Sequence, residues 1–254
     1  MSSNYSVNVS ESVKKLFMDN IIDKDAAESF GKGSRTILAP DLDEVEYDPV
    51  FTCIIMDKSG SMHCCQQAVV DAQNAMIDAL RDSAITRHGA HFILQYQFDE
   101  KLLPIHDAEA LATARGNDNV ALLTLDMYRP GGQTALYKSV HMVLQDMMGL
   151  LSKARDQGMN AKFVIVLVSD GADNECGIKP EDIRNLVKQL QEQGILKTSI
   201  IVGLLNPQFN EKQLENIRKN IGFEKSLVCD QSSPRKIRET FVMASQSAVA
   251  RTQL

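Results

Sequence analysis

Short apolar runs alternate with longer amphipathic stretches from residue 51 to the end of the chain. The runs are rich in β-branched and aromatic residues, which is typical of buried strands. Between them, apolar residues recur every three or four positions, which predicts helices that bury one face. The sequence predicts five parallel strands, at 51–56, 91–98, 163–168, 198–205 and 225–229. It predicts long helices at 66–85, 135–157, 180–194, 210–221 and 233–249.

A sixth strand is predicted as the antiparallel partner of the second strand. The run 101–105 follows the turn residues Asp99 and Glu100, and its Pro104 favours the edge of a sheet. A short helix is expected near 107–114. Strands separated by helices form right-handed βαβ units. The predicted fold class is therefore α/β, with a Rossmann-like, doubly wound sheet. That sheet is mostly parallel, has one antiparallel edge strand and carries helices on both faces.

The N-terminal part of the chain does not follow this alternation. We therefore divide the chain into an acidic arm over 1–49, partly helical or flexible, and a domain over 50–250. Within the arm, one amphipathic helix is expected at 10–22, and 38–49 is expected to be extended or mobile. Residues 1–50 hold ten acidic and five basic side chains, which accounts for most of the net charge of −6. The arm is expected to be solvated, with a docking peptide as the alternative.

Composition narrows the class of protein further. A chain of 254 residues, 44% of them hydrophobic, is long enough for one large domain or two small ones. Its negative charge gives no electrostatic support to a nucleic-acid partner. No apolar run approaches the roughly 20 residues that cross a bilayer, and the N-terminus lacks the features of a signal peptide. Five cysteines without a repeating spacing predict reduced thiols. The chain is expected to be cytoplasmic, without a membrane partner.

Oxygen-bearing side chains stand at the predicted carboxyl ends of two strands and before one long helix. Open α/β sheets bind ligands at the carboxyl ends of their strands, so these side chains are expected to meet at one edge. They are Asp57, Ser59, Ser61, Thr134 and Asp170. Carboxylates and hydroxyls are hard ligands that suit Mg²⁺, or Mn²⁺ or Ca²⁺. Each feature also has a simpler interpretation, as a serine–glycine turn, a helix N-cap at Thr134 or a turn at Asp170.

The D-x-S-x-S motif at 57–61, the later threonine and the strand-end SDG at 169–171 resemble a von Willebrand factor A (VWA) domain. The resemblance covers about 50–250 and includes a complete metal-ion-dependent adhesion site (MIDAS). It implies that Ser59 and Ser61 coordinate the metal directly and that Thr134 does so directly or through water. Asp57 and Asp170 would act largely through water. A carboxylate from a partner protein would complete the open site, and no reaction would be catalysed.

The neighbourhood of the predicted metal contains two further groups of residues. Contacts to the partner are expected at Gly60, Met62, Gly132, Gln133 and Gly171. Integrin members of the family carry two aspartates at the positions of Cys64 and Cys65, which serve an adjacent calcium site. Thiols do not suit Ca²⁺, so a single metal is expected. With His63 and Cys176, these cysteines could form a zinc site or a disulfide switch, although their spacing matches no zinc pattern. The alternative is that they are thiols packed as small apolar groups.

The leading functional prediction is a non-enzymatic, metal-dependent protein-binding module. It would act as an adaptor or scaffold in a multiprotein bacterial system, through a partner that supplies an acidic residue. Within the family, the chain is most similar to stand-alone intracellular bacterial members of the TerY-like group. One alternative is a haloacid-dehalogenase-like phosphohydrolase using Asp57, although Ser59 stands where such enzymes usually carry their general acid. The other is a metal-independent structural VWA module.

Overall fold

A six-stranded sheet forms the centre of the molecule, with strand order β5-β4-β3-β6-β7-β8. The computed structural model describes residues 5–33, 35–40, 42, 45, 48–81, 90–112, 120–171, 173–174 and 177–252. The strands of the sheet are β3 (Val50–Asp57), β4 (His91–Phe98), β5 (Leu102–Ala112), β6 (Lys162–Ser169), β7 (Leu196–Leu205) and β8 (Lys225–Asp230). All pair in parallel except β5, which runs antiparallel to β4 at one edge. This confirms the predicted mostly parallel sheet with one antiparallel edge strand.

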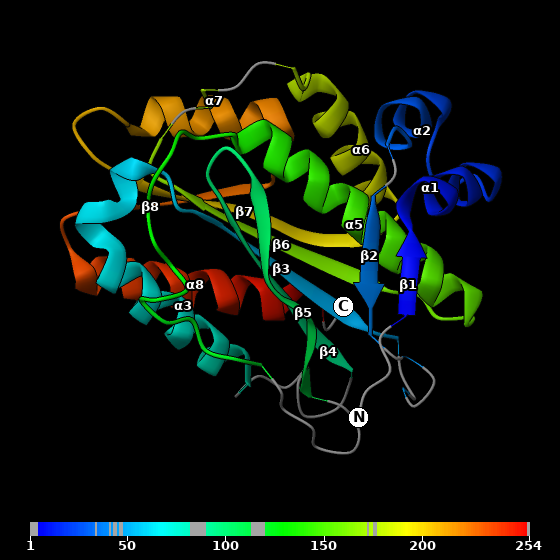
Figure 1. Ribbon diagram of the computed structural model, residues 1–254, viewed down its shortest axis with the longest axis horizontal. Helices are drawn as coiled ribbons and strands as arrows, with labels where there is room; N and C mark the ends of the chain where they lie inside the picture. Colours follow the sequence, from blue (N-terminus) through cyan, green and yellow to red (C-terminus); the bar gives the residue numbers. More distant parts are fainter. Residues whose placement is uncertain are drawn as a thin grey trace.

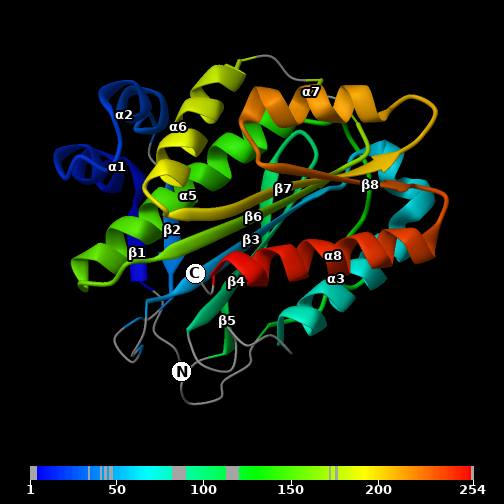
Figure 2. The ribbon, with the colours of Figure 1, turned by 180° about the vertical axis from the view of Figure 1, so that it is seen from behind.

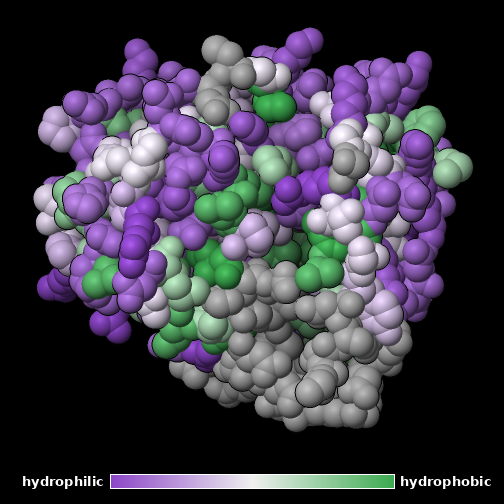
Figure 3. Space-filling view, viewed as in Figure 1, coloured by the Kyte–Doolittle hydropathy of each residue, from purple (hydrophilic) through white to green (hydrophobic). Residues whose placement is uncertain are grey.

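Helices cover both faces of the sheet (Figures 1 and 2). One face carries α5 (Leu136–Asp156), α6 (Pro180–Glu192) and α7 (Glu211–Ile221). The other face carries α3 (Gln66–Arg81) and α8 (Pro234–Thr252), which pack side by side. Because the helices turn their apolar sides to the sheet, much of the described surface in Figure 3 is hydrophilic. No described helix is both long and apolar enough to cross a membrane.

Strand β3 shows why its sequence reads as a continuous apolar run. All of its residues are buried, because helices lie over both of its faces. Phe51 and Ile55 contribute to the core beneath α5, and Ile54 and Met56 contribute to the core shared with α3 and α8. The ring of Phe51 stacks between the rings of Phe92 and Phe163 on the neighbouring strands. The polar residues that follow this strand are thereby fixed at the edge of a rigid sheet.

The prediction of a short helix near 107–114 is wrong for the residues that the structure describes. Strand β5 continues to Ala112, paired with β4 up to His91, and 113–114 lie outside the described residues. The pairing includes register shifts, so the strand is irregular along its length. Backbone pairing with β4 therefore outweighs the local helical pattern. The helix predicted at 66–85 is described as far as Arg81, and its last residues fall in the part that is not described.

The N-terminal segment forms two helices and a small antiparallel sheet. Its elements are β1 (Tyr5–Asn8), α1 (Val9–Met18), α2 (Lys24–Phe30) and β2 (Thr36–Ala39). The amphipathic helix expected at 10–22 corresponds to α1, whereas α2 was not predicted. Val13, Leu16 and Phe30 are completely buried and belong to the same core as α5. Part of the stretch expected to be extended, 38–49, lies outside the described residues. The domain boundary at residue 50 stays a prediction.

An ion pair between the partly exposed Arg35 and the buried Asp146 joins this segment to α5. Arg35 donates to both carboxylate oxygens of Asp146, at 2.5 and 2.7 Å, and the Tyr96 hydroxyl donates to the same carboxylate at 3.0 Å. The Asp146 side chain is only 3% exposed. One helical turn away, Gly149 allows β2 to approach closely, since a Cβ there would lie 2.7 Å from Cδ1 of Ile37. The N-terminal residues described here are therefore part of the packed molecule.

Candidate metal centre

The candidate site begins where two neighbouring parallel strands end. Asp57 is the last residue of β3, and Asp170 directly follows β6. Because the register pairs Met56 with Val168, the two carboxylates come to the same edge of the sheet. Asp57 is completely buried and Asp170 is 1% exposed. After Ser59, the chain turns into the 3₁₀-helix η1 (Gly60–Cys65), which leads into α3.

The D-x-S-x-S residues are joined to Asp170 by a chain of hydrogen bonds. The backbone N–H of Ser59 donates to Oδ1 of Asp57 at 2.8 Å. The Oγ atoms of Ser59 and Ser61 lie 3.2 Å apart, and the Ser61 hydroxyl donates to Oδ1 of Asp170 at 2.7 Å. Two residues more than a hundred positions apart in the sequence therefore share one small polar site. The sequence prediction that these groups converge agrees with this geometry.

Thr134 reaches the same site from the loop before α5. Its Oγ1 would lie 3.8 Å from a Cβ placed on Gly171, and its carbonyl accepts from Asn174 N–H at 2.8 Å. The N-cap of α5 is Ala135, so Thr134 does not fill the capping position that was its simpler interpretation. A further backbone bond joins the two loops, because Gly60 N–H donates to the Gly132 carbonyl at 3.1 Å. The five predicted ligand residues thus gather at one edge of the sheet.

Burial makes the two carboxylates costly to ionise. Burial raises the pKa of Asp57 to about 6, against the opposing effect of hydrogen bonds from Ser169 and Ser59, and the charge of Asp170 adds to the increase. Burial also raises the pKa of Asp170, opposed by hydrogen bonds from Ser61, Gln231 and Asn206. Nearby, Lys58 forms an ion pair with Asp99, so its charge is already matched. Ionisation of both carboxylates is therefore unfavourable in this site unless a cation balances their charge.

Further polar groups donate hydrogen bonds to the two aspartates, and the sequence did not predict these contacts. Ser169 donates to Oδ2 of Asp57 at 2.6 Å, and the Tyr128 hydroxyl donates to the Asp57 carbonyl at 2.5 Å. Gln231 donates to Oδ2 of Asp170 at 2.5 Å, and Asn206 donates to its carbonyl at 3.0 Å. Ser169, Asn206 and Gln231 all lie at or just beyond the carboxyl ends of strands. The rule that pointed to Asp57 and Asp170 could have identified them too.

The residues expected to contact a partner differ in their exposure. Gly60, Gly132 and Gln133 are exposed, and Gly171 is half-buried. Gly132 has φ +74°, a conformation that favours glycine, where the loop passes Asp99. Met62 is the exception, because its side chain is completely buried in the core shared with α3 and α8. Met62 therefore packs in the core beneath the site, and its side chain is not available to a partner.

The cysteines that the structure describes near the site do not form a zinc centre. Cys64 is exposed and Cys65 is buried, and Cys176 lies outside the described residues. Burial raises the pKa of the Cys65 thiol to about 12, so it stays protonated at neutral pH. Among the described residues, no three or more His, Cys, Asp or Glu side chains gather so as to hold a metal. A cation at the candidate site would therefore need the serine and threonine hydroxyls as ligands. Two carboxylates and three hydroxyls fit a hard divalent cation.

A mostly parallel sheet with carboxylates and hydroxyls at its carboxyl edge defines an α/β domain of the Rossmann-like class. The sequence profile of the von Willebrand factor type A domain matches residues 53–241, and the chain belongs to that family. VWA domains are typically non-enzymatic interaction modules. Among curated proteins, no sequence matches the chain significantly.

Solved structures show the same fold at low sequence identity. A von Willebrand factor type A protein from Catenulispora acidiphila is 20% identical, with a TM-score of 0.53 over 84% of this chain and 44% of that one. The PilB minor pilin from Streptococcus sanguinis is 13% identical, with a TM-score of 0.54 over 86% and 66%. Proximal thread matrix protein 1 from the mussel byssus, with a zinc-occupied MIDAS motif, is 17% identical, with a TM-score of 0.51 over 81% and 49%. The chain thus spans between two fifths and two thirds of these proteins.

Proposed function

We propose that this chain is a metal-dependent protein-binding module with a complete MIDAS. Its ligands are Asp57, Ser59, Ser61, Thr134 and Asp170. The observation that carries the proposal is the hydrogen-bonded path from Asp57 through Ser59 and Ser61 to Asp170, with Thr134 beside it. The site lies at the edge where open α/β sheets bind their ligands. The zinc described in the mussel protein of the same fold is consistent with a divalent cation at this edge.

The donor set explains how binding would depend on the cation. Two buried carboxylates match the charge of a divalent ion, and the hydroxyls add neutral ligands without further charge. A bound Mg²⁺, Mn²⁺ or Ca²⁺ would supply an open coordination position that accepts a carboxylate from a partner protein. The exposed loop residues Gly60, Gly132 and Gln133 would surround that carboxylate. A role as an adaptor in the bacterial cytoplasm, and the similarity to TerY-like members, stay predictions from the sequence.

The test is quantitative capture of binding proteins from a bacterial lysate on the immobilised full chain. The capture compares Mg²⁺ with EDTA, and wild type with Asp57→Ala. A matched control is Asp126→Ala, which removes a carboxylate that is 92% exposed on a surface loop. Specific proteins should be retained by wild type and the control in Mg²⁺, and lost in EDTA and with Asp57→Ala. Capture that is the same under all four conditions would contradict a role for the metal.

A further inference from the structure

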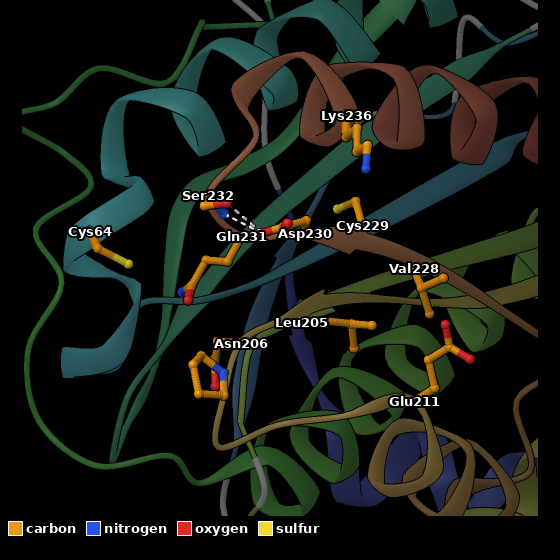
Figure 4. Close-up of a pocket in the computed structure, with 11 residues that line it drawn as sticks. Cys64, Leu205, Asn206, Glu211, Val228, Cys229, Asp230, Gln231, Ser232 and Lys236 are labelled. Carbon is orange, nitrogen blue, oxygen red and sulfur yellow. Dashed lines mark hydrogen bonds between the residues drawn. The ribbon is translucent and has the colours of Figure 1, made fainter.

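A cavity of about 1030 Å³ opens beside the candidate metal centre, across the carboxyl ends of β7 and β8 (Figure 4). Its volume is ample for several side chains of a binding partner. Asn206 and Gln231 line the cavity, and both also donate hydrogen bonds to Asp170. The cavity and the metal centre therefore share a wall made of these two residues. A segment of a partner protein that approached the metal from this side would pass directly over the cavity.

The part of the cavity beyond that wall offers apolar surface. Val228 is 43% exposed although it lies on a strand of the main sheet, and Leu205 is half-buried beside it. In Figure 4, Leu205 and Val228 lie on the opposite side of Gln231 from Cys64. Strand β8 pairs with β7 alone in the described sheet, so Val228 stands on an edge strand. Apolar surface left open next to a binding site is typical of a place that a partner covers.

The charges around the cavity disfavour an acidic side chain, and its open apolar surface favours an aliphatic one. Glu211 and Asp230 contribute two carboxylates and Lys236 contributes one ammonium group. Hydrogen bonds from Ser232 lower the pKa of Asp230, so it is ionised at neutral pH. A second acidic side chain would be repelled here, whereas an aliphatic one would cover Leu205 and Val228. The carboxylate of a partner is thus directed to the metal and its apolar neighbour to the cavity.

We propose, on the basis of the proposed function, that this cavity is a specificity pocket for an aliphatic side chain of the partner. That side chain belongs to the same extended segment that supplies the metal-ligating carboxylate. Strands β6 and β8 are separated by two strand spacings, roughly 10 Å. An extended chain covers that span in about three residues. Because the side chains of an extended chain alternate between its two faces, the pocket accepts an aliphatic residue two or four positions from the acidic one.

The test uses short synthetic glycine–serine peptides that carry one aspartate and one leucine at varied spacing. Binding to the full chain is measured by biolayer interferometry in Mg²⁺ and in EDTA. A leucine two or four residues from the aspartate, on the same face of the extended peptide, should tighten Mg²⁺-dependent binding at least about tenfold over the leucine-free peptide. Val228→Asp should remove this gain, measured as the ratio of the affinities of the two peptides for the same variant, so that any effect of the new charge on the shared aspartate cancels. Leu103→Asp is the matched control, because Leu103 is equally exposed, at 42%, on the opposite edge strand.

A second measurement uses the wild-type chain alone. Cys64 is exposed and lines the cavity on the other side of Gln231 from Val228, so bound peptide of either kind should slow its alkylation. At equal, sub-saturating concentration the aspartate–leucine peptide should slow it more, because it binds more tightly. Leucine that gives no gain, or a gain that survives Val228→Asp, would overturn the pocket and leave the metal–carboxylate contact standing. Failure of every aspartate peptide to bind in an Mg²⁺-dependent way would instead overturn the proposed function, and the pocket with it.

Discussion

Asp57 occupies the most confined position in the candidate site. Its carboxylate is completely buried, faces the charge of Asp170, and receives hydrogen bonds from Ser169 and from the backbone of Ser59. These bonds do not offset burial, since the pKa of Asp57 remains raised to about 6. A buried pair of carboxylates is unfavourable without a compensating charge. A divalent cation would provide that charge, which gives a physical reason for placing both aspartates here.

Ser169 positions the Asp57 carboxylate without being one of the predicted ligands. Ser169→Ala removes the 2.6 Å hydrogen bond to Oδ2 of Asp57 and leaves the ligand set intact. Because groups that orient metal ligands typically contribute 10–100-fold to affinity, the Kd for Mg²⁺ should rise by about tenfold. Isothermal titration calorimetry checks this, with Ser152→Ala on α5 as a matched buried-serine control. An unchanged Kd in Ser169→Ala would show that the hydrogen bond does not position the site.

The sequence indicates the candidate ligand residues more clearly than it indicates the residues that hydrogen-bond to them. Asp57, Ser59 and Ser61 form a compact motif, and Asp170 follows an unmistakable buried strand. Ser169, Asn206 and Gln231 are ordinary polar residues whose role depends on which loops meet. That meeting is set by the order β3-β6-β7-β8, which local patterns do not encode. The burial of Met62 was missed for a related reason, because the turn of η1 points it into the core.

At the scale of elements, α5 joins the sheet to the N-terminal segment. Its face toward that segment carries Asp146, paired with Arg35, and Gly149, against which Ile37 packs. On the same helix, the ring of His141 stacks on Phe30 with centroids 4.2 Å apart. These contacts explain why residues that look like a separate arm in the sequence are packed in the structure. The long, strongly periodic helices were predicted within a few residues, whereas the short α2 and the irregular β5 depend on such tertiary contacts.

Arg35→Met should destabilise the chain, because it leaves Asp146 buried without its cation. Breaking one side of a buried ion pair costs about 3 kcal/mol, which corresponds to a Tm lower by roughly 6–12 °C. The double variant Arg35→Met with Asp146→Leu should recover much of this loss, since no charge then stays buried. Arg235→Met is the control, because Arg235 pairs with Glu239 at an exposed site, and its Tm should stay close to that of wild type. Differential scanning calorimetry in EDTA measures the Tm of all four chains. Equal Tm values for Arg35→Met and wild type would contradict a stabilising role of the Arg35–Asp146 ion pair.

At the scale of the whole molecule, the sheet places everything of functional interest along one edge. The carboxyl ends of β3 and β6 carry the two aspartates, and the ends of β7 and β8 carry the residues shared by the metal centre and the cavity. The parallel direction of these strands was predicted from the alternation of strands and helices. That alternation was sufficient to place the candidate metal ligands together. It gave no indication of the cavity, which is formed by side chains from η1, from strands β7 and β8, from helices α7 and α8, and from the loops that follow the two strands.

The most direct measurement is the anomalous difference map of a crystal of the full chain grown with Mn²⁺. The account predicts one Mn²⁺ peak per chain at the carboxyl edge of the sheet. Its direct ligands should be Ser59 and Ser61, with Thr134 bound directly or through water and with Asp57 and Asp170 within one water molecule. A map without a peak among these residues, or with Thr134 turned away from Asp57 and Asp170, would contradict the central claim.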